Sequence, residues 1–380
     1  MIRRQEGFTM VELLIAMVVF AMAIAAATAI FVPLLTQFKQ QSKMTETQIE
    51  GVVGLEILRR DIEQAGYGLL WNMPAGVSYQ EASVAPANSY NDSTMNPPRA
   101  FRSGDNAVVN PVIGASDYLV IKSTIVSPEE AGPKWTYIVG KGDGTGNLRT
   151  WGTGTAGDDF RGTDRVIALI PSRGQSETSQ RILVNKGSAF SVQYSSVAAN
   201  LAPSLENDKY LVYGVSSSSD LRMPFNRADY YIKVGGTLPP RCAPNTGQLV
   251  KAVLCHGGEP GCPGAGGVLQ PETPLMDCVA DFEVIYGLDV NGDGNITFSS
   301  DISGLTAMQV RDQVKEARVY ILSHEGQKDV NYNAAVLYPA GTVTVGEFGI
   351  GRSFSLGVIT DWQRYRWKVT SMVVRAKNLL

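Results

Sequence analysis

The sequence predicts an α+β protein in which a long N-terminal helix, half transmembrane and half amphipathic, packs on a large antiparallel β-rich head. Two observations predict this class. In residues 13–35, Thr28 is the only polar side chain, and beyond about residue 70 short β-type runs alternate with Gly, Ser, Asn and Pro clusters. With 380 residues, the chain is long enough for a sizeable head, and its net charge of −3 gives no reason to expect a nucleic-acid partner.

The apolar run is long enough to cross a membrane. A helix rises about 1.5 Å per residue, and the hydrocarbon core of a bilayer is about 30 Å thick. Arg3 and Arg4 precede the run, so the positive-inside rule places the N-terminus in the cytoplasm and the head outside it. A secretory signal peptide fits poorly, because its apolar region usually has only about 7–15 residues.

Glu12 is the one charged residue near the start of this apolar run. An isolated carboxylate in lipid is costly, so an ionisable residue in a membrane helix is a functional candidate by default. The alternative is a simple signal anchor, in which Glu12 lies at the membrane interface and has no role.

The helix is expected to continue as an amphipathic segment. Apolar side chains recur at helical spacing and form one face, which comprises Met44, Val52, Leu55, Leu58, Ile62 and Ala65. A second apolar row is expected to contact a neighbouring subunit or another part of the head, and it comprises Ile49, Val53 and Ile57. We expect kinks at Pro33, Gly51 and Gly54, and a helix end near Gly66.

The head is expected to be built from short strands. Four runs have the apolar and β-branched composition of strands: residues 117–126, 165–170, 180–186 and 229–234. Residues 79–106 are polar and rich in turn-forming residues, so we expect a long surface loop there.

The four cysteines lie close together in the sequence, at Cys242, Cys255, Cys262 and Cys278. An even number in an exported chain predicts disulfides, and four cysteines allow three pairings. Loop length favours the nested pairing, with Cys255–Cys262 inside Cys242–Cys278. A metal site is the weaker interpretation, because the chain lacks a C-x-x-C motif and only His256 lies nearby.

Residues 288–301 form an acidic loop. Asp289, Asn291 and Asp293 have the D-x-N-x-D spacing that opens an EF-hand-like calcium loop, and Gly294 follows them. Alternate oxygens at this spacing point inward, so Ca²⁺ is the one cofactor that the sequence suggests.

The second half of this loop departs from the calcium pattern. Asn295 would offer its backbone carbonyl, and Thr297 its side chain or a bridging water. Position twelve is Ser300 instead of the usual glutamate, so Asp301, one residue later, would have to replace it. The alternative is a polar β-turn, since Asn-Gly and Asp-Gly are strong turn signals.

No catalytic constellation is visible in the sequence. The chain has only two histidines, His256 and His324, and it lacks both the G-x-S-x-G nucleophile motif and the phosphate-binding P-loop motif. We therefore expect a structural protein and not an enzyme.

The N-terminal sequence GFTMVELLIAM, residues 7–17, resembles the signal of type IV pilins and of type II secretion pseudopilins. The resemblance implies that residues 1–7 are a leader peptide, which prepilin peptidase removes after Gly7 before it methylates Phe8. It also implies that Glu12, at the fifth mature position, neutralises the Phe8 amine of a neighbouring subunit, because a paired carboxylate costs much less in lipid.

Three further segments resemble minor pilins of the PilW type: RRDIEQAGYG at residues 59–68, QVKEARVYILSH at 313–324 and YRWKVTSMVVRAKNLL at 365–380. The resemblance covers residues 71–240 only loosely. It implies a pilin-like arrangement with a leader at 1–7, a transmembrane and filament-core helix at 8–38, an amphipathic helix at 39–68 and a β-rich head at 69–380.

The resemblance also implies partners and a location. The chain would lie in the bacterial inner membrane with its head in the periplasm, and would then join a pilus, at its tip. Its partners would be prepilin peptidase, the inner-membrane assembly platform, other minor pilins, the major pilin and a tip adhesin. Two alternatives stay open: a type II secretion pseudopilin, and an adhesin or ligand-binding head on a pilin anchor.

Overall fold

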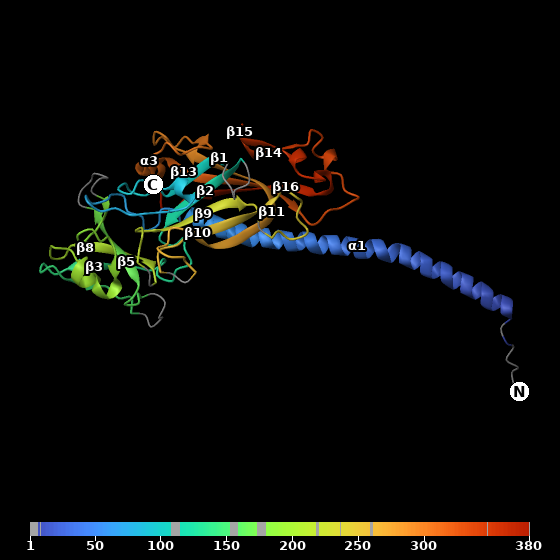
Figure 1. Cartoon of the computed structure of the whole chain (residues 1–380), viewed down its shortest axis with the longest axis horizontal. Coiled ribbons are helices and arrows are strands. Elements are labelled where there is room, and N and C mark those ends of the chain that lie inside the picture. Colours follow the sequence, from blue (N-terminus) through green and yellow to red (C-terminus); the bar gives the residue numbers. More distant parts are fainter. Residues whose placement is uncertain are drawn as a thin grey trace.

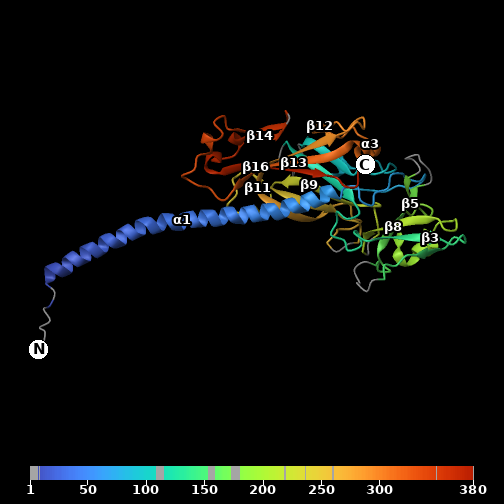
Figure 2. The same ribbon diagram turned by 180° about the vertical axis from the view of Figure 1, so that it is seen from behind.

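The computed structural model confirms the α+β class, with one long helix followed by a large antiparallel β-rich head. Helix α1, Met10–Glu63, projects far beyond the head (Figure 1), and Figure 2 shows the same arrangement from behind. The structure describes residues 7, 9–107, 115–152, 159–172, 180–217, 220–235, 237–258, 261–347 and 349–379.

The larger sheet has eight strands, and all of its pairings are antiparallel. Its order is β1 (Phe101–Ala107), β2 (Ser116–Ser123), β9 (Asn226–Lys233), β10 (Gly247–Leu254), β11 (Leu269–Leu288), β13 (Val314–Glu325) and β16 (Arg366–Arg375), and β12 (Thr297–Ser299) pairs with β11. The long strand β11 is central to this sheet, because it pairs with β10, β12 and β13 at different points along its length.

A second, six-stranded sheet forms a separate part of the head. Its order is β4 (Gly146–Leu148), β3 (Trp135–Gly140), β8 (Lys209–Ser216), β5 (Arg165–Ser172) and β6 (Gln180–Leu183), and β7 (Val192–Gln193) pairs with β5. Strands β14 (Thr342–Glu347) and β15 (Ile350–Ser355) form a two-stranded ribbon. The short helices are α2 (Val197–Asn200) and α3 (Ala307–Gln313).

The strands expected from the sequence are present. The four predicted runs fall on β2, β5, β6 and β9. The two C-terminal segments fall on β13 and β16, which pair with each other along ten residue positions.

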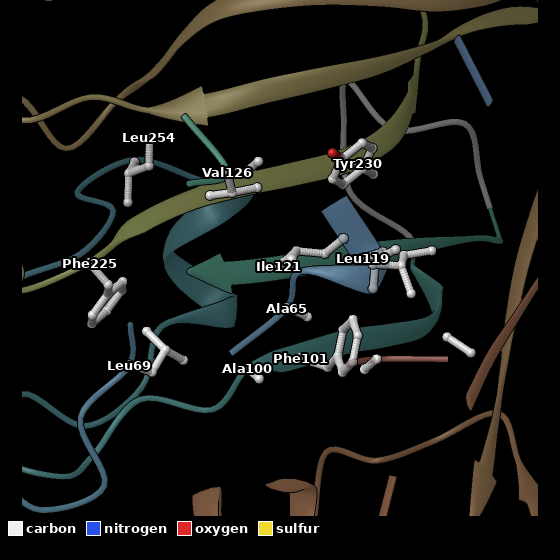
Figure 3. Packing of buried hydrophobic residues seen from close by; sticks show 14 of the residues in the cluster. Ala65, Leu69, Ala100, Phe101, Leu119, Ile121, Val126, Phe225, Tyr230 and Leu254 are labelled. Carbon is white, nitrogen blue, oxygen red and sulfur yellow. The ribbon is translucent and has the colours of Figure 1, made fainter. Parts of the chain in front are cut away.

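The main core lies where the larger sheet encloses the C-terminal end of α1. Leu58, Ile62 and Ala65 are 0% exposed, as predicted for the apolar face of the helix. Figure 3 shows Ala65 among apolar side chains from β1 and β2, including Phe101 and Ile121. Burial of these side chains stabilises the fold by about 1.5–3 kcal/mol each for the larger ones.

The predicted apolar face of α1 is wrong at its N-terminal end. Val52 is 68% exposed, and the buried positions in this part of the helix are instead Thr47, Gly51 and Gly54. The physical reason is close packing on β11, because a Cβ added at Gly54 would lie only 1.9 Å from the Leu275 carbonyl oxygen. A side chain therefore cannot occupy position 54 without displacing the Leu275 backbone.

The remaining expectations for α1 are met in part. The helix is continuous through Pro33, Gly51 and Gly54, so none of these residues ends it. After Glu63 the chain turns at Gly66, whose φ of 82° suits glycine, as expected. Of the second apolar row, Ile57 packs against the core. The other two members of the row, Ile49 and Val53, are exposed.

The expected surface loop at residues 79–106 is largely part of the folded head. Its last residues form β1, and Tyr79 and Glu81 are almost fully buried. The acidic residues of this segment meet cations from the sheet: Lys122 lies 2.7 Å from Glu81 and 2.6 Å from Asp92, and Arg227 lies 2.8 Å from Glu81. The acidic residues whose polarity predicts a surface loop here are instead part of a buried ion network.

The close contact between α1 and β11 gives a first prediction. Alanine normally stabilises a helix relative to glycine by about 1 kcal/mol. Gly54→Ala should instead lower the melting temperature of the detergent-solubilised protein, since its methyl group meets rigid backbone and overpacking typically costs about 1–3 kcal/mol.

Gly51→Ala is the matched control. Its nearest neighbour would be the flexible end of Met276, at 3.1 Å, so this variant should melt at or above the wild-type temperature. Equal melting temperatures for the two variants would contradict the packing argument.

Candidate functional site

The N-terminal segment begins with a capped helix. The Thr9 N–H and hydroxyl each donate to the Glu12 carboxylate at 2.9 Å, and the Glu12 N–H donates to the Thr9 hydroxyl oxygen at 3.3 Å. This is a capping box, which satisfies backbone donors that have no partner within the helix. Gly7, the predicted cleavage position, is exposed. Phe8 lies outside the described residues, so its predicted methylation stays a prediction.

The capping role of Glu12 was missed in the sequence analysis, although its signal is present. Thr9-Met10-Val11-Glu12 has the T-x-x-E spacing of a capping box directly before an apolar run. Glu12 therefore has two separable properties. Its side chain accepts hydrogen bonds at the start of α1, and its negative charge is available to a cation from outside the chain.

The N-terminal half of α1 has no partner within the described part of the chain. Residues 9–39 are all exposed, although almost all of them are apolar. Among the described residues, α1 is the one helix long and apolar enough to cross a membrane. An apolar surface of this size needs lipid or other apolar helices around it.

A family model described as a prokaryotic N-terminal methylation motif matches residues 2–28, which include Gly7, Phe8 and Glu12. The motif is that of a type IV pilin-like or pseudopilin-like protein. It implies processing by prepilin peptidase, membrane anchoring before assembly, and assembly of the pilus type. No curated protein and no solved structure matches the chain.

A buried ionic contact links α1 to the larger sheet. Asp61 is 7% exposed, and its carboxylate accepts from the Tyr230 hydroxyl on β9 and the Lys251 ammonium on β10. Burial raises the pKa of Asp61, and the positive charge of Lys251 opposes this rise. Sequence analysis assigned this aspartate no partner, because its partners lie far away in the sequence.

The cysteine region is held by two disulfides. Cys242 pairs with Cys278, and Cys255 with Cys262, which is the nested pairing that loop length favours. His256 is buried, its Nδ1 accepts from the Arg222 backbone N–H, and its Nε2 lies 3.1 Å from the Asn226 side-chain oxygen. These cysteines and this imidazole therefore do not form a metal site of the zinc type.

The acidic loop is a hydrogen-bonded turn that keeps some features of a cation site. The Gly294 N–H donates to one Asp289 oxygen at 3.1 Å, whereas the other Asp289 oxygen is buried without a hydrogen-bond partner. Asp293 accepts from the Asn295 N–H at 2.8 Å and from the Asn291 amide at 3.0 Å. The Asn295 N–H holds the pKa of Asp293 below its ordinary value.

The later residues of this loop turn away from such a site. The Thr297 hydroxyl donates to the Leu288 carbonyl, and Asp301 accepts from the Ser303 N–H at 2.7 Å. Strand β12 lies between Asp293 and Asp301 and pairs with β11. Calcium binding by this loop therefore stays a prediction, and β12 gives the loop a connection that an EF-hand does not have.

The Asp61 contact gives a second prediction. Asp61→Ala leaves the Lys251 ammonium, whose side chain is 13% exposed, without this carboxylate. Breaking a buried ion pair on one side typically costs about 3–5 kcal/mol. The variant should therefore show a clearly lower melting temperature, and Lys251→Met added to it should recover part of the loss.

Glu56→Ala is the matched control on the same helix. Glu56 forms an exposed pair with Arg59, so its removal should change the melting temperature little. The ionic account fails if the double variant melts no higher than Asp61→Ala alone.

Proposed function

We propose that this chain is a minor pilin of a type IV pilus, of the PilW type, which helps to prime pilus assembly and forms part of the tip complex. The observation that carries the proposal is that the two halves of α1, the helix that begins within the methylation motif, have different surroundings. Its N-terminal half is apolar and exposed, whereas its C-terminal half packs one face against the head. A subunit of this form has one surface for lipid or a helical filament core and another for the exterior.

The size and composition of the head support a low-copy position. The head contains an eight-stranded sheet, a six-stranded sheet and a two-stranded ribbon, which is a large body to pack side by side along a filament. Its disulfides fit an oxidising compartment outside the cytoplasm. We expect no enzymatic activity, and we expect the head to act by binding neighbouring pilins.

In this proposal, the charge of Glu12 decides whether a subunit enters the filament. Cleavage after Gly7 would create a cationic amine on Phe8, two residues before α1 begins at Met10. In a bundle of such helices, the Glu12 carboxylate of one subunit would neutralise the Phe8 amine of the next, because both charges would otherwise be isolated in an apolar environment.

The third prediction separates the charge of Glu12 from its capping role. Glutamine also serves in a capping box, so Glu12→Gln keeps the cap and removes the charge. We expect its recovery in sheared pili to fall at least about tenfold, since a lost charge pairing in lipid exceeds the roughly 1.4 kcal/mol that corresponds to tenfold. Membrane insertion should be unchanged.

Thr9→Ala is the matched control, because it weakens the cap and keeps the charge. It should enter pili nearly as well as the wild type. If Thr9→Ala and Glu12→Gln are equally defective, the cap and not the charge explains the role of Glu12. Co-purification of the full-length wild type with other minor pilins supports the minor-pilin assignment, whereas co-purification with secretion pseudopilins contradicts it.

A further inference from the structure

A cluster of carboxylates from three strands lies in the larger sheet, and it includes no residue of the N-terminal segment or of the acidic loop. Asp105 of β1, Asp117 of β2 and Glu283 of β11 each place one carboxylate oxygen within 4.8 Å of the others. Among the described residues, these three form the one group of at least three acidic, histidine or cysteine side chains gathered this closely. Asp105 is exposed, and Asp117 and Glu283 are buried.

The Glu283 carboxylate is the unusual member of this cluster. The residue is 0% exposed, and neither of its carboxylate oxygens has a hydrogen-bond partner. The nearest cation is Arg352 of β15, whose Nε lies 3.7 Å from Glu283, beyond hydrogen-bond distance. Its guanidinium donates instead to Asp281, at 3.1 and 2.6 Å, and to the Ala115 carbonyl at 2.5 Å.

The other two carboxylates are held by hydrogen bonds from backbone N–H groups and a side-chain amide. Asp117 accepts from the Asn106 N–H at 3.0 Å and from the Val284 N–H at 2.8 Å. Asp105 accepts from the Asn106 amide at 2.9 Å. These bonds orient the carboxylates without neutralising them, since each donor is uncharged and each oxygen keeps a second lone pair.

The charges in this cluster do not balance. Four carboxylates, those of Asp105, Asp117, Asp281 and Glu283, act together with the single guanidinium of Arg352. Unpaired buried charge is costly, so the arrangement calls for an additional cation.

The buried ion network around Glu81 and Asp92 shows that an excess of carboxylates over cations is not a general property of this head. There, three carboxylates meet four cations: Glu81, Asp92 and Asp229 pair with Lys122, Arg227, Arg99 and Arg102.

We propose that Asp105, Asp117 and Glu283 form a binding site for a hard divalent cation of the calcium class, which joins the β1–β2 hairpin to β11. Carboxylate oxygens without nitrogen or sulfur ligands favour such cations. Calcium suits the site better than magnesium, because it accepts an irregular set of oxygens and Mg²⁺ demands a near-octahedral one. Asp105 is the exposed member of the three, so a cation would reach the site from the solvent beside it. This site does not depend on the proposed function.

The test uses the full-length protein in detergent, stripped with EDTA and titrated with CaCl₂ or MgCl₂ by calorimetry and thermal melting. Millimolar Ca²⁺ should raise the melting temperature, and Mg²⁺ should raise it less. Glu283→Gln should melt at or above the wild-type temperature in EDTA, because it removes a buried charge. It should lose at least about tenfold in calcium affinity, a loss that even outer-shell substitutions reach at metal sites.

Asp105→Asn is the second variant, and its exposed position favours normal folding. It should also bind Ca²⁺ more weakly. Asp293→Ala alters the acidic loop, and it should keep the Glu283-dependent part of the calcium effect. The proposal is overturned if wild-type protein shows no calcium response, which would indicate a protonated Glu283. It is also overturned if Glu283→Gln and Asp105→Asn both keep wild-type affinity, or if only Asp293→Ala loses the response.

Discussion

The close contact between α1 and β11 determines how this chain can serve two environments. At Gly54 the helix approaches the Leu275 backbone so closely that no side chain fits between them, and two turns later Asp61 joins α1 to Lys251 and Tyr230. The C-terminal half of α1 is thereby a fixed part of the head, and the exposed apolar half extends from it in a defined direction. A helix held less firmly would not transmit the position of the membrane segment to the head.

The fold was largely predictable because its main signals are local. An apolar run, helical periodicity and β-type runs predicted the helix and four of the strands, β2, β5, β6 and β9. The buried face of α1 was not predictable in full, since Val52 suits a core by composition and the close approach of Leu275 is decided by tertiary packing. The burial of Glu81 and Asp92 was missed for the same reason, because Lys122 and Arg227 neutralise these acids from distant strands.

The candidate sites show the same contrast between local sequence signals and tertiary packing. Gly7, Phe8 and Glu12 could be identified because the methylation motif is a continuous sequence with fixed spacing. The nested disulfides followed from loop length alone. Asp61, and the cluster of Asp105, Asp117 and Glu283, could not be found in this way. Each depends on strands that meet only in the folded head, and a single aspartate or glutamate in a β-rich sequence carries no sign of its partner.

The central claim is that this chain is processed and assembled as a pilin-like subunit, and N-terminal mass spectrometry tests it most directly. The protein would be produced in cells with and without prepilin peptidase, purified from membranes and digested, and its N-terminal peptide would be identified. The account predicts that, only where the peptidase is present, the peptide begins at Phe8 and carries one added methyl group. A peptide that begins at Met1 in both strains, or cleavage beyond the apolar segment, would contradict the account.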